Sequence, residues 1–163
     1  MTFVHGIDPL MIQLGPLSLY WYSLFFALGV LLCYLLLKGV YRREGLPQRQ
    51  AESLMIYAIV GMFIGARLGY VFFYQYDYFL ANPLEVFKLW KPGLSSHGAA
   101  IGVLASVLVW SWIWQQNFFR SLSLLSLGLP IILVGVRLGN FINSEVAGIP
   151  TSGDWGVVFG RLG

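Results

Sequence analysis

Charged side chains are scarce in this sequence. Lys, Arg, Asp and Glu together make up 10% of its 163 residues, whereas hydrophobic residues make up 58% and the mean hydropathy is +0.73. Soluble globular domains carry about 25% charged residues. The shortage of charge excludes an ordinary soluble domain and indicates a membrane protein. The ten Lys and Arg residues form no continuous basic patch, so we expect no nucleic-acid partner.

Residues that bind metals or form disulfides are also few. The chain has one cysteine, Cys33, and two histidines, His5 and His97, with carboxylates scattered between them. This pattern offers no disulfide pair and no metal-ligand spacing, and we expect neither a metal nor another cofactor. No nucleophile-elbow pattern and no glycine-rich loop after a strand is present, which argues against a serine hydrolase and a nucleotide site. We interpret His5 as a tail residue.

Long apolar stretches dominate what remains. Four of them, at 19–37, 53–73, 97–114 and 121–141, approach the roughly 20 residues that a membrane-spanning helix needs. We expect an all-α fold: a polytopic membrane helical bundle with about four transmembrane helices, in one domain over residues 1–163 without a separate soluble domain. Pro130 is expected to kink the fourth helix. The aromatic segment 74–90 is too short to cross and return, so we expect an interfacial arm or half-helix there.

Basic residues indicate the orientation of these helices. The connection 38–52 holds four Lys and Arg residues and the turn 115–120 holds Arg120, so both are expected on the cytoplasmic side and the N-terminus on the periplasmic side. At 1.5 Å per residue, Arg67 lies about 21 Å and Arg137 about 24 Å from the cytoplasmic ends of their helices. Both therefore fall in the outer third of the membrane, at the depth of Tyr22 and His97.

Arg137 is the most informative residue, because an arginine at the centre of a membrane helix costs roughly 2.5 to 3.5 kcal/mol. It lies in the segment 135–148, and helical spacing places Asn140 and Ser144 on its face. Its planar guanidinium suits a lipid phosphate. The alternative is an arginine that extends to the outer headgroups without binding a substrate. Glycines four residues apart, at 61, 65 and 69 and again at 135 and 139, predict close helix packing.

Two further residues have alternative roles. Arg67 either contributes to the same anion site or pairs with Glu145 to hold helices together. His97, in Ser95-Ser-His-Gly98 at the start of the third apolar stretch, is either a helix-cap or interface residue or a group that takes up a proton near neutral pH.

These residues resemble a known family, the bacterial phosphatidylglycerol:prolipoprotein diacylglyceryl transferases. The segment Gly135-Val-Arg-Leu-Gly-Asn-Phe-Ile-Asn-Ser-Glu145 through Gly148 is similar to the signature of that family. Three further matches follow in the expected order along the whole chain: Leu19-Tyr-Trp-Tyr-Ser, Gly65-Ala-Arg-Leu-Gly-Tyr-Val and Ser96-His-Gly. The usual glycine pair after the histidine is Gly98-Ala99 here.

The resemblance implies that diacylglyceryl is transferred from phosphatidylglycerol to the lipobox cysteine thiol of a prolipoprotein, the first step of lipoprotein maturation. It implies an inner-membrane protein whose active site faces the outer leaflet, in contact with membrane lipids. Carried over by position, the catalytic residues are Tyr22, His97 and Arg137. The residues implied in binding phosphatidylglycerol are Arg67, Arg137, Asn140, Glu145 and Gly148.

Members of that family continue with a further motif and about three more membrane helices, so we expect this chain to be a fragment of a longer protein. Two other functions stay open. One is a small polytopic anion channel or transporter subunit in which Arg67 and Arg137 line the path; it predicts polar residues across the whole membrane rather than at one side. The other is a truncated homologue that binds lipid without turnover.

Overall fold

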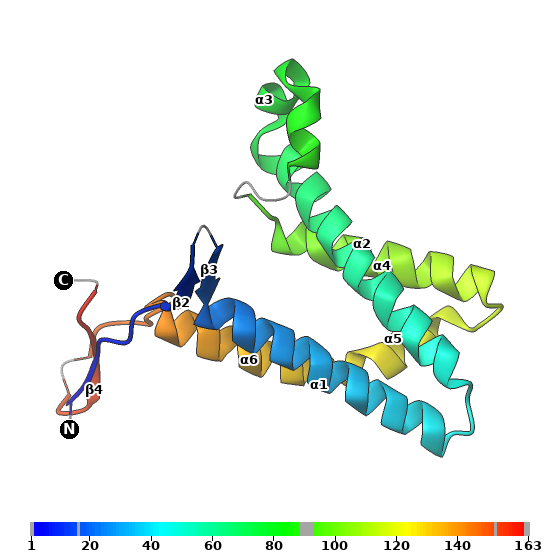
Figure 1. The fold of residues 1–163 in the computed structure, drawn as a ribbon, viewed down its shortest axis with the longest axis horizontal. Helices are drawn as coiled ribbons and strands as arrows, with labels where there is room; N and C mark the ends of the chain where they lie inside the picture. The colour runs from blue at the N-terminus through cyan, green and yellow to red at the C-terminus, as the bar shows by residue number, and fades with distance from the viewer. Residues whose placement is uncertain (1, 16, 89–92, 152, 162–163) are drawn as a thin grey trace. The chain divides into compact units, whose positions relative to one another are not determined.

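The computed structural model describes residues 2–15, 17–88, 93–151 and 153–161 (Figure 1). The chain forms two compact units. The first comprises Met1–Leu36 and Gly128–Gly163, and the second Leu37–Leu127. Helix α1 (Trp21–Arg43) begins in the first unit and ends in the second.

In the first unit, α1 packs against α6 (Leu129–Ile142) through glycines. A Cβ atom at Gly135 would lie 2.5 Å from the carbonyl oxygen of Phe25, and one at Gly139 would lie 2.6 Å from Cδ2 of Tyr22. From the α1 side, a Cβ at Gly29 would lie 3.0 Å from Cα of Ile132. These backbones approach more closely than any larger residue permits, which confirms the packing role predicted for the glycine pair.

Four short strands lie outside the helices of this unit. Strand β1 (Thr2–His5) pairs in parallel with β4 (Gly156–Phe159), so that His5 lies opposite Phe159. Strand β2 (Leu10–Leu14) pairs antiparallel with β3 (Leu17–Tyr20), which leads directly into α1. Both sheets differ from the prediction of an all-α fold. The pairing gives backbone groups outside the helices the hydrogen-bond partners that they need.

In the second unit, α2 (Gln48–Tyr74) crosses α4 (Ser96–Ile113), again through glycines. A Cβ at Gly69 would lie 2.6 Å from Cα of Gly98, and one at Gly102 would lie 2.7 Å from Cα of Gly65. The obstacles are backbone atoms of the facing helix. The stripe of small residues predicted in the second apolar stretch is therefore a helix-crossing point.

A hydrophobic core closes the other end of the second unit. Its fully or almost fully buried members come from α1, α2 and α4: Leu37, Tyr41, Ala51, Leu54, Val107 and Trp110. The indole nitrogen of Trp110 donates to Oγ of Ser53 over 3.1 Å, so the polar edge of the buried ring is satisfied. Helix α5 (Phe118–Ser126) packs beside this core, and Arg120 reaches Glu44 over 2.6 Å.

Among the described residues, three helices, α1, α2 and α4, are long and apolar enough to cross a membrane, and a fourth span results if α5 and α6 form one. The predicted polytopic helical membrane fold is therefore confirmed. The fourth stretch differs in detail, since it was predicted as one kinked helix over 121–141 and is instead broken between α5 and α6. Pro130 lies in the first turn of α6, where the missing N–H removes no intrahelical hydrogen bond.

Candidate functional site

The end of α2 that carries Arg67 is fastened to the segment that follows it. That segment contains α3 (Tyr76–Ala81) and the 3-10 helix η1 (Pro83–Phe87), which confirms the helical character predicted for the arm. Arg67 is only 3% exposed, and its guanidinium carbon lies 5.2 Å from the ring centre of Phe79. The guanidinium donates to four backbone carbonyl oxygens over 2.8 to 3.2 Å: those of Glu85, Val86, Lys88 and Gly93.

These contacts define a structural role for Arg67. A guanidinium has five N–H donors, and Arg67 already makes three hydrogen bonds to the arm and one to Gly93. A carboxylate, Glu145, was predicted as the structural partner, whereas the partners found are backbone carbonyl groups. Binding of phosphatidylglycerol by Arg67 stays a prediction.

His97 is the second residue of α4, and its side chain is exposed. The cap of this helix is Ser95, whose Oγ accepts from the backbone N–H of Gly98 over 3.2 Å. The N–H of Ser95 in turn donates to the carbonyl of Ala66 over 2.9 Å, which holds the start of α4 beside the Arg67 turn of α2. Capping, one of the alternatives for His97, is therefore done by Ser95, and the side chain of His97 is exposed.

Arg137 lies in α6 with its side chain exposed. Gly135 and Gly139 face α1, and a residue two positions from each of them points to the opposite side of the helix. Among the residues that the structure describes, Arg137 has no hydrogen-bond or ion-pair partner. Its donors are accordingly available to an anionic ligand.

Tyr22 and Asn140 lie at the same end of this helix pair. Both side chains are half-buried, and the ring of Tyr22 packs over Gly139, the neighbour of Asn140 in α6. All three residues belong to the region around the last two turns of α6, with Tyr22 at the face of α6 that packs against α1 and Arg137 on the opposite face. Hydroxyl, guanidinium and amide donors at one helix end suit a phosphate with a polar headgroup.

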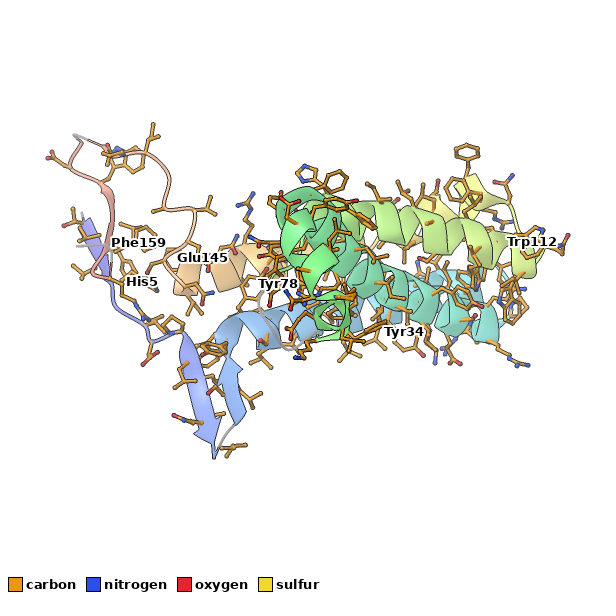
Figure 2. All side chains as sticks on the ribbon, turned by 90° about the horizontal axis from the view of Figure 1, so that it is seen from above. His5, Tyr34, Tyr78, Trp112, Glu145 and Phe159 are labelled. Carbon is orange, nitrogen blue, oxygen red and sulfur yellow. The ribbon has the colours of Figure 1, made fainter. Side chains whose placement is uncertain are left out.

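The chain leaves α6 in a strained turn. Ser144 has φ 58° and Val146 has φ 53°, in the left-handed region that a β-branched residue seldom adopts. Ser144 is also buried, and it lies beyond the end of α6, so the prediction that it extends the helical face of Arg137 is wrong. Glu145, labelled in Figure 2, is exposed and accepts from Nδ2 of Asn143 over 3.2 Å.

Gly148 follows this turn with φ 87°, a conformation that L side chains rarely adopt. A Cβ there would meet nothing within 4 Å. The position therefore requires glycine for its backbone conformation and not for space.

His5 is the residue that the sequence analysis misjudged. Its ring is fully buried between Phe141 and Phe159, with ring centres 4.6 and 5.5 Å away, and Nε2 donates to the carbonyl of Ile142 over 3.2 Å (Figure 2). The interpretation as a tail residue is wrong. No spacing pattern could have revealed this, because the hydrogen-bond partner lies 137 positions away in the sequence.

The candidate residues fall into two sets. Arg67 and His97 belong to the second unit, and the remaining five, Tyr22, Arg137, Asn140, Glu145 and Gly148, belong to the first. The apolar helices that carry these polar groups define a polytopic helical membrane protein.

The chain belongs to the prolipoprotein diacylglyceryl transferase family, whose model matches residues 9–163. Curated relatives include proteins named phosphatidylglycerol–prolipoprotein diacylglyceryl transferase. The one from Tolumonas auensis is 44% identical over 158 residues, covering 95% of this chain and 60% of the relative. The one from Bordetella parapertussis is 40% identical over 163 residues, covering 96% and 61%. The chain thus spans about three fifths of the length of these relatives, and the predicted family is confirmed.

Proposed function

We propose that this protein transfers diacylglyceryl from phosphatidylglycerol to the lipobox cysteine thiol of prolipoproteins. The names of its relatives support the reaction and both substrates. The single observation that supports it best is Arg137, an exposed cation on an apolar helix with no partner among the described residues and one helical turn from Asn140. Such a cation is expensive in a membrane unless it binds an anion.

The reaction makes one bond and breaks one. The cysteine sulfur, as thiolate, forms a bond to the glyceryl carbon that carries the phosphate ester. The bond between that carbon and the ester oxygen breaks, and glycerol phosphate leaves with the electron pair. Arg137 stabilises the charge that builds up on the departing phosphate, because its fork of donors strengthens as the charge grows.

His97 is proposed as the base that accepts the thiol proton. Its imidazole is exposed at the start of α4, and it is not needed as a helix cap because Oγ of Ser95 accepts the N–H of Gly98. Tyr22 and Asn140 are proposed to orient the headgroup through their hydroxyl and amide. Glu145 and Gly148 are proposed as further parts of the phosphatidylglycerol site. Arg67 is proposed to contribute to that site indirectly, by fixing the position of the arm through its hydrogen bonds.

The protein is proposed to lie in the bacterial inner membrane with the N-terminus in the periplasm and the site open to the outer leaflet. Lys38, Arg42 and Arg43 all lie at the C-terminal end of α1, which supports a cytoplasmic position for that end. Arg137 lies in the last two turns of α6.

Anion transport gains no support, because Arg67 uses its donors on backbone carbonyls instead of lining a path.

The test is a transfer assay with a synthetic lipobox peptide and phosphatidylglycerol vesicles, using protein expressed from its natural gene. Arg137→Ala is expected to abolish thioether formation without preventing membrane insertion, and Arg137→Lys to retain a small part of it, since a point charge cannot bind bidentately. Arg43→Ala is the matched control, because it removes the same charge from an exposed site at the far end of α1. Wild-type thioether formation by Arg137→Ala would refute the role of this residue.

A further inference from the structure

The strained turn after α6 needs support from outside the helix. Ser144 and Val146 both adopt positive φ, which costs free energy and persists only where surrounding contacts fix it. Within the segment, the N–H groups of Asn143, Ser144 and Glu145 donate to carbonyls of the last turn, at Gly139, Phe141 and Asn140. These local bonds end the helix, yet they leave the carbonyl of Ile142 without a donor from the helix itself.

His5 supplies that donor. A carbonyl oxygen only accepts, so Nε2 of His5 carries the proton in its 3.2 Å hydrogen bond to Ile142. The ring is held between Phe141, in the last turn of α6, and Phe159 of β4, and these two phenylalanines also contact each other at 5.7 Å. The parallel pairing of β1 with β4 places His5 opposite Phe159. Strands β1 and β4 thus meet the end of α6, and β1 comes from the opposite end of the sequence.

We propose that His5 is a positioning residue, which fixes the end of α6 and the following turn so that Asn140 and Glu145 present their side chains to the phosphatidylglycerol headgroup. This inference rests on the proposed function. His5 itself touches no reacting atom, since it is fully buried. It acts through Ile142, which lies between Asn140 and Glu145 in the chain, and a displacement of about 1 Å at a substrate-binding group is enough to impair an enzyme.

Three variants separate the parts of this role. His5→Phe keeps an aromatic ring between Phe141 and Phe159 but removes the donor. His5→Gln keeps an N–H at nearly the position of Nε2 and loses the ring. Val4→Ala is the control, because Val4 lies on the same strand with its side chain 69% exposed. All are made in the protein expressed from its natural gene, and steady-state kinetics are measured with phosphatidylglycerol vesicles and a lipobox peptide.

We expect His5→Phe to raise the KM for phosphatidylglycerol about tenfold, the effect of one lost hydrogen bond, and to leave the KM for the peptide unchanged. His5→Gln is expected to restore the KM to within about threefold, and Val4→Ala to match the wild type. A purely structural role would lower only the fraction of active molecules, which reduces the maximal rate and leaves both KM values unchanged. That outcome, or a failure of His5→Gln to restore the KM, overturns the proposal.

A second measurement does not depend on activity. In His5→Phe, backbone hydrogen exchange of residues 143–146 is expected to be at least tenfold faster than in the wild type, while exchange within α2 and α4 stays the same. Unchanged exchange in the turn contradicts the proposal. An inactive wild-type protein with fast exchange in His5→Phe would refute the proposed function alone and leave the hold of His5 on this turn intact.

Discussion

The crossing of α2 and α4 offers a sharp test of the packing. In Gly102→Ala the new Cβ would lie 2.7 Å from Cα of Gly65 and closer still to the carbonyl oxygen of Gly61, whereas ordinary contact begins at 3.4 Å, so the helices must separate. Both obstacles, this Cα and the carbonyl oxygen of Gly61, are backbone atoms that no side-chain rotation can move. Overpacking of this kind costs about 1 to 3 kcal/mol.

Gly39→Ala is the matched control. Gly39 lies within α1, and a Cβ there would meet nothing within 4 Å, so the change is expected to stabilise the helix by about 0.5 to 1 kcal/mol. The free energy of unfolding is measured for both variants in mixed detergent micelles titrated with a denaturing detergent. Gly102→Ala should be destabilised and Gly39→Ala should not. Equal stabilities for the two variants would refute the close crossing of α2 and α4.

Three further predictions concern single residues. Arg67→Lys is expected to speed backbone hydrogen exchange in residues 83–88 about tenfold or more, because an ammonium has three donors and cannot bind four carbonyls. Unchanged exchange would contradict the role of Arg67 in fixing the arm to α2. His97→Gln is expected to slow thioether formation at neutral pH, and an unchanged rate and pH profile would remove His97 as the base. Gly148→Ala is expected to lower the free energy of unfolding by about 1 to 2 kcal/mol, because alanine rarely adopts the positive φ of this position. Gly148→Asn is expected to lower it less in the same unfolding titration, and equal losses for the two variants would point to a cause other than φ.

Much of the helical frame could be predicted from the sequence. The apolar stretches gave the positions of α1, α2 and α4, because a membrane helix needs a continuous run of about 20 residues. The glycines at 61, 65, 69, 135 and 139 indicated the two packing faces, because only small residues let backbones approach. The aromatic composition of 74–90 indicated an arm, and α3 and η1 lie there.

What the sequence did not reveal depends on contacts between distant segments. Strand β1 pairs with β4 across almost the whole chain, and no local pattern in four-residue strands indicates such a partner. The burial of His5 follows from that pairing. Similarly, charge alone suggested a carboxylate partner for Arg67, whereas backbone carbonyl groups in and after η1 satisfy it.

Ser144 shows a different limit. Helical periodicity places it on the face of Arg137 and Asn140 only if the helix continues, and α6 ends at Ile142. The ending is made by backbone bonds to the last turn and by the donor from His5, and the second of these cannot be anticipated from the local sequence. The helical-face prediction therefore applies to Arg137 and Asn140, which lie within α6, and fails for Ser144, which follows the helix end.

The most direct test of the central claim is the stoichiometry of the reaction. Protein expressed from its natural gene is incubated with phosphatidylglycerol and a lipobox peptide, the lipidated peptide is quantified by mass spectrometry, and the released glycerol phosphate is quantified in the aqueous phase. We predict equal amounts of thioether and glycerol phosphate from the wild type and neither from Arg137→Ala. If the wild type formed no thioether, or formed the thioether without releasing glycerol phosphate, the proposed transfer would be contradicted.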